Sequence, residues 1–158
     1  MGVLNDLAGD HFLSELFERQ AELNERVGKP TGSVKHRLGN IDDPDLKQQL
    51  KIEVGSWIND YLIAMTNEVE ELRDCTFWKH WCREAQDGRR FELHDLQNAR
   101  VEVIDMLFFW ISLAQCVGLD AKDVYELYLK KLGVNHARQD DGYSMAEKTE
   151  DDNRDLTV

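Results

Sequence analysis

The chain has 158 residues, 42% of them hydrophobic and 32% charged, with a formal net charge of −12. This length suits one domain, which buries roughly 70% of the surface of its unfolded chain. With only two prolines, the composition favours a helical globular protein over a disordered or all-β one. The acidic excess argues against sequence-independent nucleic-acid binding, because such binding needs Lys and Arg to neutralise phosphates.

The first residues of the sequence, its hydropathy and its cysteines lead us to expect a cytoplasmic protein with reduced thiols. No run of about 18 apolar residues occurs, and the opening MGVLNDLAGDHF does not join a basic region to an apolar one, so we expect neither export nor a membrane partner. Cys75, Cys82 and Cys116 lack CxxC spacing, which argues against a disulfide framework and a structural zinc site. We expect one all-α domain over residues 1–146 and an acidic, mobile tail over 147–158.

A first helix is predicted from about Asp10, a plausible N-cap, to Val27, with Gly28 beyond its end. Its apolar residues recur at intervals of three and four, which is typical of a buried stripe. Gln20 and Asn24 lie one turn apart on or beside that stripe. A buried amide is costly unless its donors and acceptors are paired. These two amides therefore either read the polar edge of a ligand or bond to neighbouring backbone and solvent.

The region between the first and second helices is predicted to be a loop. Residues 28–42 contain glycines and a proline interleaved with four basic residues, which either attract phosphate or mark a solvated connector. The second helix is predicted to begin sharply, with Asp43 as N-cap and Pro44 at the first helical position. Its apolar stripe extends to about Arg73.

Two pairs of acids at i, i+3 spacing, Glu68 with Glu71 and Glu102 with Asp105, are the strongest functional signal. Such spacing places both carboxylates of a pair on one helix face. The first pair prolongs the stripe of the second helix, and the second pair heads the stripe of a helix predicted over about residues 91–117. Converging carboxylates repel one another, and oxygen ligands suit a hard cation. We predict a site for two or more Mg²⁺ ions, with Mn²⁺ as a substitute, that acts on a phosphorylated substrate.

An aromatic segment separates the two acid-bearing helices. Phe77, Trp78 and Trp81 surround Lys79 in the sequence FWKHW, where the rings either stack on a base or pack in the core. Asp87 and the following glycine indicate a turn before the next helix. Later in the chain, Gly118 is predicted to end that helix and Asp120 to cap the last one.

These segments, in this order, resemble the all-α nucleoside triphosphate pyrophosphatase superfamily, and its dimeric dUTPase branch more than the small MazG-type proteins. The resemblance covers roughly residues 12–143. It rests on QAELN, the ExxE pair, FWKHW, the ExxD pair and NHARQDDGY at residues 135–143. It implies a helical bundle with a four-helix catalytic core of the MazG/dimeric dUTPase type, which works as a symmetric homodimer.

The resemblance also implies a reaction and a division of roles. The expected reaction converts a deoxynucleoside triphosphate and water to the monophosphate and diphosphate, with dUTP as the first choice and dGTP or dATP as the alternative. Glu71, or else Glu68, would accept the proton of the attacking water. The residues implied for base binding are Gln20, Asn24, Trp78 and Trp81, and those implied for phosphate binding are Lys79, Lys131, Asn135, Arg138 and Tyr143.

Two rival interpretations use the same acids differently. A non-catalytic helical binding module would keep them in surface salt bridges, and it would gain no stability from Mg²⁺ with a nucleotide. A di-iron carboxylate protein would need Glu-x-x-His pairs, and neither acid-bearing helix contains one. The enzymatic interpretation is therefore the one we expect.

Overall fold

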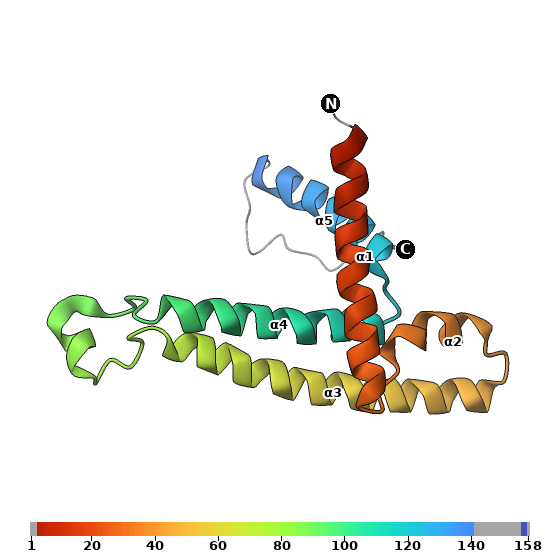
Figure 1. The fold of residues 1–158 in the computed structure, drawn as a ribbon, viewed down its shortest axis with the longest axis horizontal. Coiled ribbons are helices and arrows are strands. Elements are labelled where there is room, and N and C mark those ends of the chain that lie inside the picture. Colours follow the sequence, from red (N-terminus) through yellow and green to blue (C-terminus); the bar gives the residue numbers. More distant parts are fainter. Residues whose placement is uncertain (1–2, 141–155, 158) are drawn as a thin grey trace. The chain divides into compact units, whose positions relative to one another are not determined.

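The computed structural model describes residues 3–140 and 156–157. The chain divides into two compact units, residues 18–118 and residues 1–17 with 119–158. Within the described residues the secondary structure is helical, apart from one isolated antiparallel bridge between Thr76 and Leu93 (Figure 1). The predicted all-α class is thus confirmed. The four-helix core stays a prediction, and the domain boundary expected at residue 146 lies outside the described residues.

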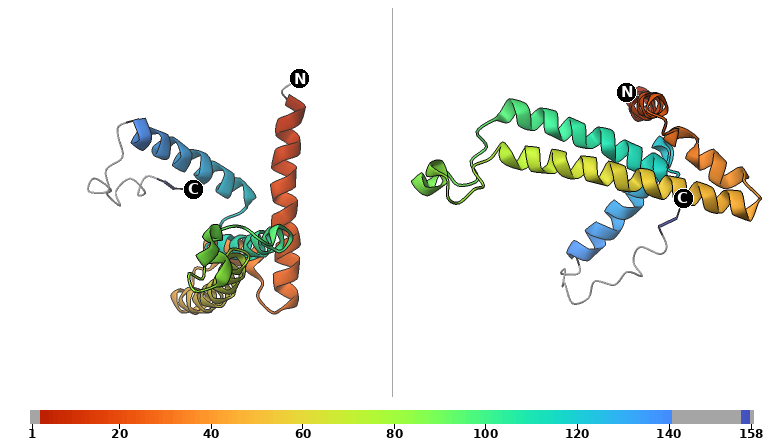
Figure 2. Two further views of the ribbon diagram at one scale, coloured as in Figure 1. Left: turned by 90° about the vertical axis from the view of Figure 1, so that its left-hand side faces the viewer. Right: turned by 90° about the horizontal axis from the view of Figure 1, so that it is seen from below.

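The unit of residues 18–118 is organised around two long helices, α3 and α4, which run side by side in opposite directions (Figures 1 and 2). An irregular connector, residues 75–95, joins them at one end and includes a π-helical turn. Short helical segments and the last residues of α1 pack near the other end. The bounds are α1 Val3–Arg26, η1 Thr31–Ser33, α2 Val34–Asn40, α3 Pro44–Asp74, η2 Ala85–Arg89, α4 Leu96–Cys116 and α5 Ala121–Asp140.

The start of α3 confirms the predicted cap. The side chain of Asp43 accepts hydrogen bonds from the backbone N–H groups of Asp45 and Leu46 at 2.8 and 3.2 Å. Pro44 occupies the first helical position, where no N–H is needed. Two of the unpaired donors at this helix end are thereby satisfied. The helix then continues for 31 residues, which carries its acids far from its own N-terminus.

Three helix boundaries differ from the prediction. Helix α1 begins at Val3 instead of Asp10, since residues 3–9 include good helix formers and no proline. The predicted loop at 28–42 contains η1 and α2, because Val34 is completely buried and tertiary packing overrides the local breakers. Helix α4 begins at Leu96 and not near residue 91. Its N-cap is Asp95, whose side chain accepts a hydrogen bond from the Asn98 N–H at 3.0 Å.

The core of this unit lies where α2, α3 and α4 meet. The predicted apolar stripe of α3 is confirmed over its middle, although Leu46 is 53% exposed and lies outside the core. Among the described residues, no single helix is both long and apolar enough to cross a membrane. Helices α4 and α5 meet the criteria of length and composition only as a pair. The buried core residues are Val34, Leu50, Val54, Trp57, Tyr61 and Cys116.

The predicted end of α4 and the predicted cap of α5 are also confirmed. Gly118 follows α4 with φ +79°, a left-handed conformation that glycine adopts easily. Asp120 Oδ1 accepts from the Asp123 N–H at 2.9 Å, and Asp123 Oδ2 accepts from the Asp120 N–H at 3.1 Å. This reciprocal pair caps the first turn of α5.

Candidate functional site

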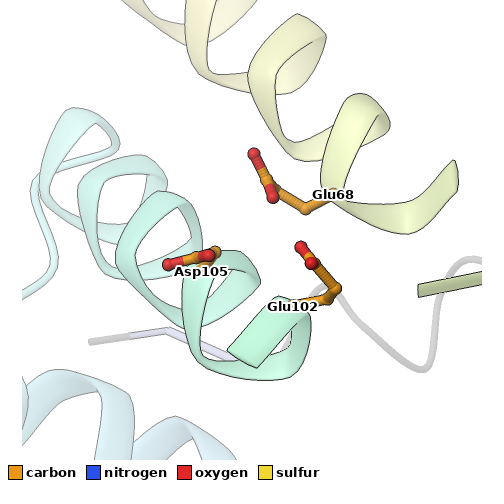
Figure 3. Close-up of side chains that lie close together, drawn as sticks. All are labelled: Glu68, Glu102 and Asp105. Atoms are coloured by element: carbon orange, nitrogen blue, oxygen red, sulfur yellow. The ribbon is translucent and has the colours of Figure 1, made fainter. Parts of the chain in front are cut away.

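Three of the four predicted acids come together between α3 and α4 (Figure 3). Glu68 projects from α3, and Glu102 and Asp105 project from α4. One carboxylate oxygen from each residue lies within 4.8 Å of the other two. Glu102 is only 4% exposed, while Glu68 and Asp105 are half-buried. The cluster therefore concentrates negative charge at the contact between α3 and α4.

The electrostatics of the cluster favour a bound cation. Partial burial raises the pKa of Glu68, and a hydrogen bond with Glu102 raises it further. The negative charges of Glu71 and Asp105 act in the same direction. Each of these effects disfavours the ionised form of Glu68. A positive charge among the three oxygens would reverse them, and three carboxylate oxygens are the donors that a hard divalent cation prefers. The residues present therefore fit Mg²⁺ or Mn²⁺.

Glu71 is placed differently from the other acids. Its side chain is exposed and does not belong to the group of three oxygens. It lies one helical turn from Glu68 and close enough to raise the pKa of that residue. Glu71 thus stands beside the cluster, where a carboxylate remains open to water and can accept a proton.

The two predicted amides are joined in a buried hydrogen-bond network. Gln20 Nε2 donates to Asn24 Oδ1 at 2.9 Å and to Ser112 Oγ at 3.0 Å. Asn24 Nδ2 donates to Thr31 Oγ1 at 2.8 Å and to Ser112 Oγ at 3.0 Å. Thr31 Oγ1 donates to Gln115 Oε1 at 2.6 Å. All five side chains are buried, and the network ties α1 to η1 and α4.

Three members of this network were given no role by the sequence pattern. Ser112 shares the predicted acid-bearing face of α4, and Gln115 lies one turn further along, while Thr31 falls in the predicted loop. Their common signal is a polar residue beside an apolar segment, as in ISLAQC, where a buried side chain must find a partner. Sequence spacing alone does not reveal which partner it finds.

The two predicted tryptophans lie together in the connector. Their rings meet edge to face with centroids 6.0 Å apart. Trp78 Nε1 donates to Asp74 Oδ1 at 2.6 Å, and Lys79 Nζ lies 3.2 Å from the same oxygen; both hydrogen bonds lower the pKa of Asp74. Lys79 also lies 5.5 Å from the centre of the Trp78 ring. Trp78 is thus engaged within the connector, whereas Trp81 is 60% exposed and open to a ligand.

The four predicted base-binding residues therefore form two groups on either side of the acids. Ser112, which holds the amides, follows Asp105 by seven residues, or about 10.5 Å along α4. Asp74, which holds Trp78, follows Glu68 by six residues, or about 9 Å along α3. Because the helices run in opposite directions, these two steps lead away from each other. The two groups are therefore separated along the helix pair within one chain, and the base-binding roles of their members stay predictions.

Most of the predicted phosphate-binding residues belong to the second unit. Lys131 is half-buried and Asn135 is exposed on α5. Arg138 lies in the last turn of α5, and Tyr143 falls outside the described residues. The two units are not placed relative to each other, so the phosphate-binding roles of these residues stay predictions.

Comparison with known proteins decides the family of the chain. A family profile described as dUTPase matches residues 12–117, which include the amide network, the acid cluster and the connector. The chain belongs to the dUTPase family. This dUTPase-family chain is accordingly an enzyme, a nucleoside triphosphate pyrophosphatase, and the predicted resemblance to this superfamily is confirmed.

Two phage proteins named dCTP pyrophosphatase are similar to this dUTPase-family chain. The protein of Enterobacteria phage T4 is 27% identical over 128 residues, which cover 68% of this chain and 74% of that protein. The protein of Enterobacteria phage LZ5 is 27% identical over 108 residues, which cover 58% of this chain and 63% of that protein, so less than two thirds of its length is spanned. No solved structure matches the chain.

Proposed function

We propose that this enzyme hydrolyses a pyrimidine deoxynucleoside triphosphate to the monophosphate and diphosphate. The observation that carries the proposal is the cluster of Glu68, Glu102 and Asp105 between two facing helices. Membership of the dUTPase family supports dUTP as the first substrate, and the name of the two phage relatives supports dCTP as the second. The purine triphosphates, the alternative from sequence, have no comparable support.

The three clustered carboxylates would hold the metal, with Mg²⁺ as first choice and Mn²⁺ as substitute. When bound, Mg²⁺ neutralises phosphate oxygens and acidifies a nearby water molecule. Glu71, exposed beside the cluster, would accept the proton of the attacking water as a general base. Glu68 is less suited to that role, because its carboxylate already shares a hydrogen bond with Glu102.

The phosphate tail of the substrate needs positive partners besides the metal. We assign this role to Lys131 and Arg138, with Asn135 and Tyr143 as neutral hydrogen-bond donors and Lys79 as a further cation. Charge-assisted hydrogen bonds of this kind are roughly twice as strong as neutral ones. Lys79 would have to leave its ion pair with Asp74, which costs little because that pair is exposed.

The test is a product analysis with matched variants. The purified protein is incubated with Mg²⁺ and each of dUTP, dCTP, dTTP, dATP and dGTP, and the nucleotide and phosphate products are separated. We expect monophosphate and diphosphate, formed fastest from dUTP or dCTP. Release of inorganic phosphate with a nucleoside diphosphate, or hydrolysis of none of the five, would contradict the proposal.

Glu71→Gln and its neighbour Glu70→Gln form the matched pair for the general base. Both residues are exposed on the last turns of α3, and Glu70 pairs with Arg73 at 2.7 Å in a surface ion pair that contributes little to stability. We expect turnover to fall at least a hundredfold in Glu71→Gln and to persist in Glu70→Gln. Both variants should keep the helical circular dichroism spectrum.

The cytoplasmic location stays a prediction.

We further propose that the enzyme is a homodimer. Val101, Ile104 and Phe108 recur at intervals of three and four along α4, and each is at least 44% exposed. An apolar stripe of this kind on a helix is costly in water and fits a second copy of the chain. Light scattering should give twice the 18.4 kDa mass of one chain, and Ile104→Glu should return it to one.

A further inference from the structure

Cys75 joins the end of α3 to the start of α4, directly beyond the acids. Its backbone carbonyl oxygen accepts from the N–H groups of His94 and Asp95 at 3.0 and 3.4 Å. Its sulfur accepts from Asn98 Nδ2 at 3.5 Å, and the thiol donates to the Glu71 carbonyl oxygen at 3.4 Å. Cys75 is only 3% exposed, so the thiol is shielded from solvent. One buried residue thus ties the two acid-bearing helices together.

The thiol of Cys75 uses all of its hydrogen-bonding capacity. A thiol has one weak donor and one weak acceptor, and here they meet a backbone carbonyl oxygen and the Asn98 amide. A buried cysteine often serves only as a small apolar residue that fills space. The two roles are distinguishable, because serine could form both bonds again and alanine could form neither.

The bond between Cys75 and Asn98 fixes the register of the two antiparallel helices. Cys75 follows Glu68 by seven residues, and Asn98 precedes Asp105 by seven. Seven residues correspond to about two turns, or about 10.5 Å. Glu68 and Asp105 belong to the same cluster, so equal steps from it lead to two residues that also meet. Helices α3 and α4 therefore keep one register from the acid cluster to the connector.

Glu71 and Glu102 occupy the same level within that register. Glu71 follows Glu68 by three residues, and Glu102 precedes Asp105 by three. Glu71 thus lies between the cluster and Cys75, and its carbonyl oxygen is bonded to the thiol. A shift of the last turn of α3 along α4 would change the distance between the Glu71 carboxylate and the proposed metal ligands.

The position of Glu71 needs support from outside its own helix. Its side chain is exposed, and it belongs to the last turn of α3, which ends at Asp74. The last four carbonyl oxygens of a helix have no partner within the helix. That of Glu71 accepts from the Cys75 N–H at 3.3 Å and from the Cys75 thiol at 3.4 Å. Cys75 therefore holds the turn that carries Glu71.

We propose that Cys75 and Asn98 are positioning residues that hold the general base Glu71 in a fixed place beside the metal cluster. The inference rests on the proposed function and deepens it, since it states which contacts set the geometry of the base. A general base must lie within hydrogen-bonding reach of the proton that it accepts, and a misplacement of about 1 Å can cost about a hundredfold in rate. Loss of either positioning residue should therefore lower kcat and leave KM nearly unchanged.

The experiment measures kcat and KM for Cys75→Ala and Asn98→Leu, with Mg²⁺ and the better substrate of dUTP and dCTP. Both substitutions remove the bond between sulfur and amide, and we expect kcat to be about tenfold lower with KM within about twofold of wild type. Cys75→Ser should recover most of the lost turnover. Asn98 is exposed, so its substitution keeps the test open where Cys75→Ala does not fold.

Two matched controls accompany these variants. Cys82→Ala removes the half-buried thiol of the connector, and Gln97→Leu changes the exposed neighbour of Asn98. Both should keep wild-type kcat and KM. All of the variants should keep the helical circular dichroism spectrum.

A double-mutant cycle tests whether Cys75 acts through Glu71. Substitutions that act through one group are not additive. In the Glu71→Gln background, Cys75→Ala should lower the residual turnover less than twofold, because no base is left to misplace. A general disturbance of the structure would instead repeat the tenfold decrease.

The outcomes separate this inference from the proposed function. Wild-type kcat in both Cys75→Ala and Asn98→Leu would overturn the positioning role while the hydrolytic function stands. The same conclusion would follow if Cys75→Ser were as slow as Cys75→Ala, or if the effects of Cys75→Ala and Glu71→Gln were additive. Wild-type turnover in Glu71→Gln would remove the assigned base and this inference with it. Hydrolysis of none of the triphosphates would remove the proposed function as a whole.

Discussion

Replacing Glu68 by glutamine should stabilise the metal-free protein although it should abolish turnover. The substitution keeps the size of the side chain and its hydrogen bonding but removes one of three charges that lie within 4.8 Å of one another. Most substitutions destabilise a protein. An increase in stability would therefore be a specific sign that these carboxylates repel one another in the absence of metal.

The magnitude follows from Coulomb's law. Two unit charges 4.8 Å apart repel by about 0.9 kcal/mol in water. Glu68 faces two such partners, Glu102 and Asp105, and it is half-buried, so screening is weaker than in bulk water. Because the raised pKa of Glu68 lowers its average charge, we expect about 1 to 2 kcal/mol. For a chain of this length that is a rise in Tm of about 2 to 8 °C.

The assay is thermal unfolding with EDTA and with Mg²⁺, for the wild-type protein, Glu68→Gln and the control Glu70→Gln. The wild type should gain about 2.7 kcal/mol at a Mg²⁺ concentration one hundred times Kd, and Glu68→Gln should gain much less. Glu70→Gln should follow the wild type in both conditions. A Glu68→Gln protein that is less stable than wild type in EDTA and still responds fully to Mg²⁺ would refute the repulsion and the metal site together.

Three further predictions concern stability. Asp43→Ala should lower the free energy of unfolding by about 1 kcal/mol through loss of the α3 cap, with Asp42→Ala as control, measured by urea unfolding. Leu50→Ala should cost about 2 to 5 kcal/mol because Leu50 is 2% exposed, whereas Ile52→Ala, at a 64% exposed position on the same helix, should cost less than 1. Burial raises the pKa of Cys116 from 9 to about 11, so the stability it contributes is present below pH 9 and is lost as the pH rises through 11. The urea midpoint should fall over that range, and fall less in Cys116→Ala.

What the sequence predicts well is what depends on local chemistry. The start of α3 follows from Asp43 and Pro44 alone, because a cap acts within one turn. The convergence of acids from two helices follows from spacing together with the repulsion that would otherwise exclude it. The first argument needs only neighbouring residues, and the second needs only the spacing within each pair of acids and a simple physical rule.

The connector between α3 and α4 could not be predicted in this way. It is held by contacts between its two ends, such as the Thr76–Leu93 bridge and the Phe77 and His94 rings stacked with centroids 4.3 Å apart. Phe91 has φ +66°, which no sequence rule assigns to an aromatic residue and which prevents α4 from beginning there. Tertiary pairing, and not local preference, decides the fold of this segment.

In the proposed function, the antiparallel arrangement of α3 and α4 would allow one contact between helices to serve both ends of a nucleotide. Tyr61 precedes Glu68 by seven residues, and Ser112 follows Asp105 by seven, so both steps lead to the same end of the helix pair. The Tyr61 ring also lies 6.3 Å from that of Phe109, between the acids and the amide network. Apolar packing there holds the carboxylates in place despite their repulsion, and it would keep the predicted base-binding amides at a fixed distance from the proposed metal ligands. A site that must place phosphates and base simultaneously depends on such rigid support.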